Sequence, residues 1–145
     1  MEEMKALPRT RIGLACEELG QSAVVDRCIR VYEGLLGEEH FLRILGGDHA
    51  ARLIDDGIPD RQVYWTRVWA MRGLLWSWDG REPSVLHAAA SDDAWRVREM
   101  CAKVVARHRC GDLLTRMDEL KRGDPNARVR REANRAVEIV AAAEG

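Results

Sequence analysis

The sequence contains few of the residues from which catalytic and metal sites are usually built. Its four cysteines include no C-x-x-C pair, and its four histidines are scattered without metal-ligand spacing. The signatures G-x-S-x-G, G-x-G-x-x-G, H-E-x-x-H and the P-loop do not occur. These absences favour a non-catalytic protein that needs no metal and no cofactor, with cysteines that stay reduced.

Long hydrophobic runs and strand patterns are also lacking. The longest stretches without charge, such as residues 83–91, are far shorter than the roughly 18 apolar residues that would suggest a membrane span. The N-terminal residues lack the basic start and apolar core of a secretory signal, so we expect a cytoplasmic protein with no membrane partner. No alternating pattern bounded by hairpin turns indicates a β-sheet.

The net charge of −1 lacks the overall basicity of a dedicated nucleic-acid binder. The charges are nevertheless unevenly distributed, since residues 1–60 hold 7 basic and 12 acidic residues whereas residues 95–135 hold 12 basic and 6 acidic ones. The second half of the chain can therefore carry a local basic surface.

Residues 92–105 return 32 positions later as residues 124–137, and this internal repeat is the most informative feature of the sequence. Both segments contain Asp, then Arg-Val-Arg, then Val at the same spacings. A period of this length is typical of stacked two-helix units. We therefore expect an all-α protein that contains repeated helix pairs.

Within each repeat the apolar residues mark one face of a helix. Val97 and Val129 lie at the centre of this face, and we expect both to be buried. Asp92 and Asp124 precede the two helices, where their carboxylates are expected to act as N-caps.

The pattern D-x-x-x-R-V-R, followed by a small and then an aliphatic residue, resembles the second helix of HEAT repeats, including the bacterial phycobilisome-lyase-like variety. The resemblance covers residues 60–143 and implies a short α-solenoid, a right-handed superhelix of HEAT-like helix pairs. It also implies that Arg98 and Arg130 form an internal ladder with the aspartates of the repeats. Residues 1–57 would then be an irregular N-terminal helical cap or a degenerate repeat, and residues 1–145 a single domain.

Glycines at intervals along the chain predict the ends of short helices. The expected helices span residues 10–19, 22–36, 39–45, 49–56, 61–77, 84–91, 94–108, 112–122 and 126–143.

Four of the five tryptophans lie between residues 65 and 78, and core filling accounts for most of this cluster. The segment WTRVWAMR at residues 65–72 is also similar to the DNA alkylation repeat family, whose HEAT-like repeats carry Trp and Arg on a concave face. That resemblance implies nucleic-acid binding and a relation to DNA glycosylases. Such an enzyme needs a carboxylate in its cleft, and Asp79 is the only nearby candidate.

Helical phase places a set of basic and aromatic residues on one side of three consecutive repeats, at about 240° to 280° from the buried centre. This predicts a continuous strip suited to carboxylates or phosphates, because the planar guanidinium binds either group bidentately. Reversing the charges of Arg96 and Arg128 is expected to leave the melting temperature nearly unchanged. The predicted partner-binding residues are Trp65, Arg72, Trp76, Arg96, Lys103, Arg107, Arg128 and Arg135.

The strip predicts a scaffold or binding module that engages a protein partner, through an acidic segment of that partner. The alternative is a nucleic-acid-binding protein of the alkylation-repeat type. A third possibility is a bilin-lyase-like or otherwise enzyme-associated HEAT protein. Only the generic repeat pattern supports this possibility.

Overall fold

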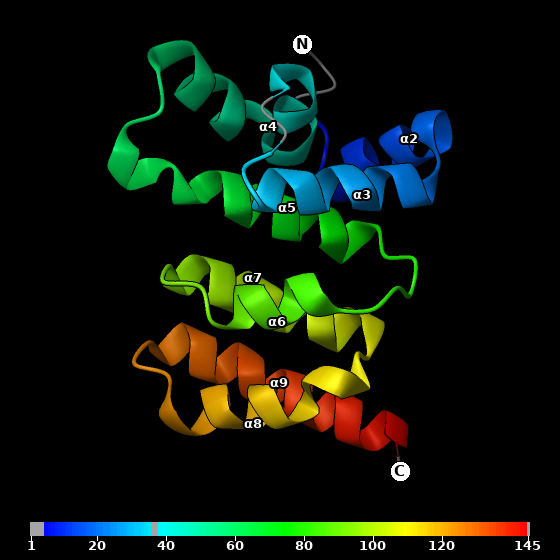
Figure 1. Ribbon diagram of the computed structural model, residues 1–145, viewed down its shortest axis with the longest axis vertical. Helices are drawn as coiled ribbons and strands as arrows, with labels where there is room; N and C mark the ends of the chain where they lie inside the picture. Colours follow the sequence, from blue (N-terminus) through cyan, green and yellow to red (C-terminus); the bar gives the residue numbers. More distant parts are fainter. Residues whose placement is uncertain (1–4, 36–37, 145) are drawn as a thin grey trace. The chain divides into compact units, whose positions relative to one another are not determined.

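The computed structural model describes residues 5–35 and 38–144, and these residues form an all-α protein without a strand. Eight α-helices and two short 3-10 helices follow one another along the chain (Figure 1). Their bounds are α2 Pro8–Leu19, α3 Gln21–Tyr32, α4 Glu39–Asp56, η1 Asp60–Gln62, α5 Tyr64–Trp76, α6 Ser84–Ala90, α7 Trp95–His108, η2 Gly111–Leu113, α8 Leu114–Gly123 and α9 Ala127–Glu144.

The expected helices coincide with these elements, with differences at their ends. The helix expected over residues 22–36 ends at Tyr32, and residue 36 lies outside the described residues. The helix expected from residue 61 begins at Tyr64, because a 3-10 turn over Asp60–Gln62 precedes it. The two short helices expected over 39–45 and 49–56 are joined in α4, which is broken at Gly47.

Contacts divide the chain into two compact units, Met1–Asp79 and Gly80–Gly145. The sequence placed a boundary between the N-terminal cap and the repeats at residues 57–60. In the structure α5 packs with α2, α3 and α4, so this helix belongs to the first unit.

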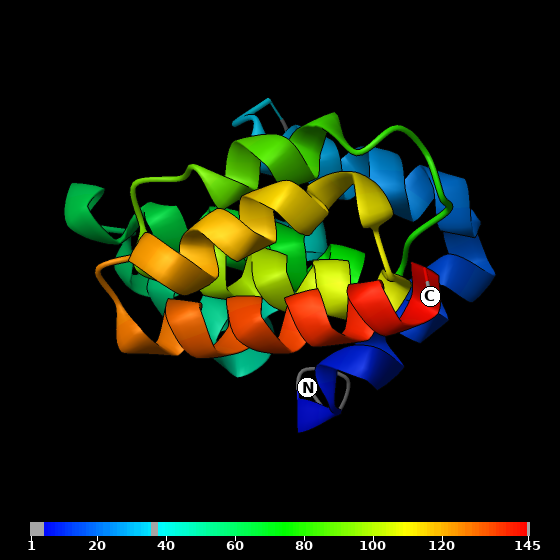
Figure 2. The ribbon, with the colours of Figure 1, turned by 90° about the horizontal axis from the view of Figure 1, so that it is seen from below.

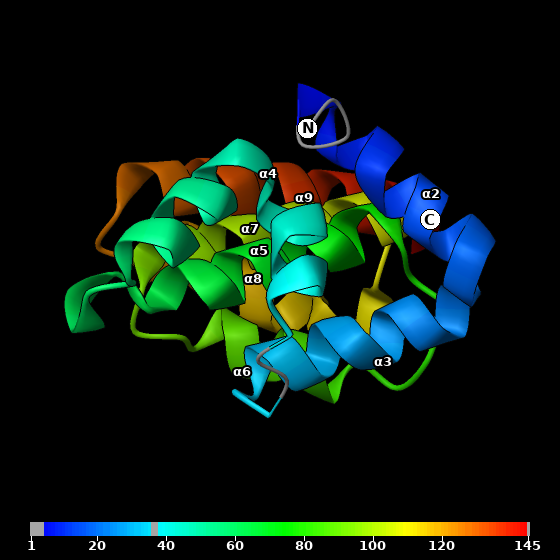
Figure 3. The same ribbon diagram turned by 90° about the horizontal axis from the view of Figure 1, so that it is seen from above.

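In the first unit, α5 is covered by α3, α2 and α4 (Figure 3). Trp69 of α5 is fully buried, as core filling predicted, and His49 of α4 contacts its ring edge-on. A side chain at Gly46 would collide with this indole, since an added Cβ would lie 2.8 Å from it. Small residues on α4 therefore make room for the largest core side chain.

The break in α4 is filled by a buried arginine from α2. Gly47 has a φ of 62°, a conformation that glycine adopts without strain, and the two halves of the helix point in different directions (Figure 3). Arg11, 7% exposed, donates from Nε to the carbonyl of Ile44 at 2.8 Å and from Nη2 to that of Leu45 at 3.4 Å. These carbonyls end the first half of α4, so Arg11 acts as its C-terminal cap from another helix.

The second unit consists of two helix pairs, α6 with α7 and α8 with α9 (Figures 1 and 2). The helices α7 and α9 also pack against each other and carry the two copies of the internal repeat. Val97 and Val129 are both 0% exposed, as the helical phase predicted. Cys101 and Ala133, one turn later, are also fully buried, so small side chains lie in the packed face.

Candidate functional site

The internal repeat of the sequence is also a repeat of hydrogen bonds in the second unit. Arg98 Nη1 donates to the main-chain carbonyl of Asp92 at 2.8 Å, and 32 residues later Arg130 Nη1 donates to that of Asp124 at 2.6 Å. The Asp92 carboxylate accepts from the amide two residues on at 2.9 Å, and that of Asp124 does so at 2.9 Å as well. The same turn thus precedes both α7 and α9.

These turns correct the expectation that the aspartates are N-caps. The N-cap of α7 is Ala94, two residues after Asp92. Before α9, the side chain of Asn126 accepts from the amides of Arg128 at 2.8 Å and Val129 at 3.3 Å, which is the bonding of an N-cap. The aspartates instead stabilise the turns that lead into the helices.

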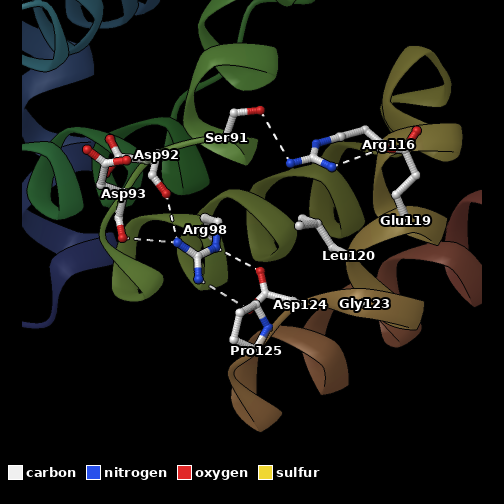
Figure 4. A pocket seen from close by; sticks show the side chains of 10 residues that line it. All are labelled: Ser91, Asp92, Asp93, Arg98, Arg116, Glu119, Leu120, Gly123, Asp124 and Pro125. Atoms are coloured by element: carbon white, nitrogen blue, oxygen red, sulfur yellow. Dashed lines mark hydrogen bonds and ion pairs between the residues drawn. The ribbon is translucent and has the colours of Figure 1, made fainter.

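Asp124 also joins the two repeats. Its carboxylate accepts from Arg98 Nε at 2.7 Å and Nη2 at 3.2 Å, a bidentate pair between the turn before α9 and helix α7 (Figure 4). The side chain of Asp124 is 2% exposed and that of Arg98 is 14% exposed. Burial alone raises the pKa of Asp124, but the hydrogen bonds from Arg98 and the Asn126 amide, with the charges of Arg98 and Arg116, outweigh burial and lower it.

A cavity of about 560 Å³ opens beside this pair, between the end of α6, the start of α7 and helix α8 (Figure 4). Its second arginine, Arg116, binds Glu119 at 3.0 Å and donates to the carbonyl of Ala90 at 3.1 Å. Both arginines of the cavity are therefore engaged by groups of the protein itself. This arrangement holds the second unit together and presents no unpaired cation to a ligand.

A different cluster lies where α7 and α9 pack. The guanidinium of Arg96 lies over the Trp95 ring at 4.4 Å, and that of Arg128 lies over the same ring at 5.1 Å. Arg128 also forms a bidentate pair with Glu99, through Nε to Oε2 at 2.9 Å and Nη2 to Oε1 at 3.3 Å. We call Trp95, Arg96, Glu99 and Arg128 the tryptophan cluster.

The tryptophan cluster leads to a revised expectation for the substitution of Arg128. Glu99 is only 8% exposed, so its charge depends on Arg128 for compensation. Replacing Arg128, whose side chain is 55% exposed, with Glu would set a second carboxylate beside the buried one of Glu99. The melting temperature is therefore expected to fall, not to remain nearly unchanged.

The cluster contains two residues that the sequence did not single out. Trp95 is adjacent to Arg96, and Glu99 is 29 positions before Arg128. This spacing is close to the 32-residue period of the repeat. It could therefore have predicted that Glu99 and Arg128 form an ion pair between neighbouring helices.

The other predicted strip residues of the second unit flank the tryptophan cluster. On α7, Lys103 is half-buried and Arg107 is exposed; they follow Arg96 by 7 and 11 residues and so lie on its side of the helix. On α9, Arg135 is exposed and lies 3.8 Å from Glu132. The structure thus brings Arg96 and Arg128 together and places the other three along the same two helices.

The predicted strip residues of the first unit have different surroundings. Trp65 is half-buried, with its ring 4.5 Å from His49 and stacked on Tyr64. Trp76 lies under the guanidinium of Arg9 at 5.6 Å. Arg72 is half-buried, and burial lowers its pKa.

Two further kinds of site, for metal ions and for membranes, concern residues 5–35 and 38–144. Within these ranges no group of three or more His, Cys, Asp or Glu side chains could hold a metal ion. No helix of the same ranges combines the length and apolar character needed to cross a bilayer. None of the protein-family models, curated proteins and solved structures compared with the chain matches it.

Proposed function

We propose that this protein is a non-catalytic binding module that takes an acidic segment of a partner protein on the surface of α7 and α9. The observation that carries the proposal is the tryptophan cluster, in which arginines from two different helices lie over one indole ring. We call the face formed by the half-buried Arg96 and Lys103 and the exposed Arg107, Arg128 and Arg135 the basic surface.

The proposed architecture is a short α-solenoid of HEAT-like helix pairs. The repeated bonds of Arg98 and Arg130 support it, because each arginine donates to the carbonyl six residues before it in the same turn. The pair between Arg98 and Asp124 supports it further, since it links one repeat to the next as the resemblance to HEAT repeats implies. In repeat proteins of this kind each unit contacts its neighbours, and extended surfaces are left for binding.

Stacking on Trp95 suits arginine for carboxylate binding. A guanidinium that lies over an aromatic ring is held in place by the cation–π interaction, while its N–H groups point outward in its own plane. The ring thereby reduces the side-chain entropy that an arginine loses on binding. Lys103 and Arg107 lie 7 and 11 residues after Arg96 on the same side of α7, so they extend the positive charge along this helix.

Acidic residues within the surface favour a peptide over a phosphate backbone. Glu99 neutralises Arg128, and Glu132 lies beside Arg135, so positive and negative groups are interspersed. A nucleic-acid strand carries a charge at every nucleotide and would meet these carboxylates, whereas a peptide can place its acidic residues opposite the cations alone. The nucleic-acid alternative is therefore the second choice.

A charge-reversal experiment tests the proposal. The variant Lys103→Glu with Arg135→Glu changes one residue on each helix, at positions 32 residues apart, and leaves the Arg128–Glu99 pair intact. Its control, Lys121→Glu with Arg122→Glu, makes the same change of charge on exposed residues of α8. Binding is measured by fluorescence anisotropy with a labelled peptide rich in Asp and Glu and, separately, with a single-stranded oligonucleotide.

We expect the wild type and the α8 variant to bind the acidic peptide with similar affinity and the surface variant to bind at least about tenfold more weakly, a loss of about 1.4 kcal/mol. Equal losses in the two variants would mean that only net charge matters, and would contradict the proposal. Tighter binding of the oligonucleotide, with a steep dependence on salt, would favour the nucleic-acid alternative.

A further inference from the structure

Arg72 on α5 has no counter-charge among the residues that the structure describes. It is half-buried, and among residues 5–35 and 38–144 it forms neither an ion pair nor a hydrogen bond. A guanidinium has five N–H donors, and taking it partly out of water without a partner is unfavourable. No Arg72 nitrogen is both fully buried and unpartnered, so its N–H groups reach solvent, from which an anion can bind them.

A second arginine, Arg11, adds positive charge near Arg72. Arg11 of α2 is buried, and its N–H groups are directed to main-chain carbonyls, those of Ala6, Ile44 and Leu45. Burial lowers the pKa of Arg11, the charge of Arg72 lowers it further, and Asp48 opposes both. Arg11 thus contributes a positive charge close to Arg72, while three of its five N–H donors are occupied by carbonyls.

A third arginine lies on the same side of α5. The guanidinium of Arg9 lies over the ring of Trp76, and Trp76 follows Arg72 by four residues, one helical turn later. Arg9 is exposed, so its N–H groups can reach a ligand from the solvent side. The three arginines and the carboxylate of Asp48 together carry a net charge of +2.

We propose that Arg72 and Arg9 bind a phosphate group, with the buried charge of Arg11 strengthening the attraction. A phosphate dianion matches the net charge, and its oxygens accept the bidentate hydrogen bonds that a guanidinium donates. A single carboxylate would neutralise only half of the charge. The ligand is inorganic phosphate or the phosphate of a small phosphomonoester, and the site lies entirely within residues that precede Gly80.

This site is independent of the basic surface on α7 and α9. It shares no residue with the variants that test acidic-peptide binding, so either proposal can fail while the other stands.

The test is thermal unfolding of the full chain in a phosphate-free buffer, with added inorganic phosphate or glycerol phosphate. The variant Arg72→Gln removes the proposed donor. Its matched control, Arg52→Gln, removes an exposed arginine of α4 in the same unit. Without phosphate, Arg72→Gln is expected to melt no lower than the wild type, because the charge that it removes has no partner among the described residues.

With phosphate at about ten times its dissociation constant, the melting temperature of the wild type and of Arg52→Gln should rise by about 3 °C, and that of Arg72→Gln should not. A tighter response to the ester than to inorganic phosphate identifies a phosphorylated small molecule as the ligand. Equal responses identify free phosphate. A rise of the same size in all three proteins, or in none, would overturn the proposal.

A second variant keeps the proposal testable if Arg72→Gln does not fold. Arg9→Gln changes only an exposed side chain, and it should weaken phosphate binding several-fold in a titration followed by tryptophan fluorescence. An affinity for phosphate equal to that of the wild type would count against the site.

Discussion

Removing the negative charge of Asp124 should destabilise the protein far more than removing that of an exposed aspartate. In Asp124→Asn the side chain keeps its shape and its acceptor for the Asn126 amide, but Arg98 loses its counter-charge. Breaking a buried ion pair from one side costs about 3 to 5 kcal/mol. Arg98 retains its bonds to the carbonyls of Asp92 and Asp93, so we expect a smaller loss of about 2 to 3 kcal/mol.

The matched control is Asp118→Asn on α8. Asp118 pairs with Arg122 at 2.8 Å, nearly the distance between Asp124 and Arg98, but their side chains are 37% and 77% exposed. An exposed pair four residues apart on a helix contributes about 0.3 to 0.5 kcal/mol. The two substitutions therefore remove ion pairs of almost equal length that differ in burial.

The assay is urea unfolding followed by circular dichroism, repeated at several pH values. Because the pKa of Asp124 is lowered in the folded protein, its ionised form stabilises the fold above the pKa of an unfolded aspartate, about 3.9, and this contribution is lost as the pH falls through the folded pKa. The difference between wild type and Asp124→Asn should be full near neutral pH and should shrink below about pH 4. If Asp124→Asn costs no more than Asp118→Asn near neutral pH, the ion pair between the repeats does not stabilise the fold.

Two further predictions concern the close packing of the core. Gly73→Ala should destabilise the first unit by about 1 to 3 kcal/mol, because an added Cβ would lie 2.3 Å from the Cys28 sulfur and 2.8 Å from Leu45 Cδ2. Gly13→Ala, with no atom within 4 Å of the added Cβ, should instead raise the melting temperature, and equal effects in the two variants would contradict this account. Burial raises the pKa of the Cys28 and Cys101 thiols, that of Cys101 to about 12, so both should react slowly with a thiol reagent near pH 8 until the protein is unfolded, and labelling as fast as in the unfolded chain would refute their burial.

Much of the second unit could be predicted because its information is local and repeated. The spacing of apolar residues identified the buried sides of α7 and α9, and both valines at their centres are fully buried. The position of the N-cap was wrong by two residues, because the sequence D-P-N offers two side chains that can each accept from a main-chain amide. The structure assigns the turn to Asp124 and the cap to Asn126.

The first unit was harder to predict because its decisive contacts join residues far apart in the sequence. Arg11 caps carbonyls 33 and 34 positions away, and only the break at Gly47 gives those carbonyls their orientation. No periodic pattern marks such a contact. An arginine in an amphipathic helix is ordinarily expected at the surface, so its burial could not be read from its neighbours.

The two arginines of the segment Arg-Val-Arg illustrate how helical phase gives identical side chains different contacts. Arg96 and Arg98 lie on opposite sides of the buried Val97, each 100° away from it. On one side, Arg98 donates to the carboxylate of Asp124, in the turn before α9, and to the carbonyl of Asp92, in the turn before α7. On the other side, Arg96 is stacked over Trp95. Identical side chains two residues apart therefore have different surroundings: Arg98 joins two turns, whereas Arg96 contacts an aromatic ring. One repeat later Arg130 donates to the turn before α9, and Arg128 lies over Trp95 but is also paired with Glu99.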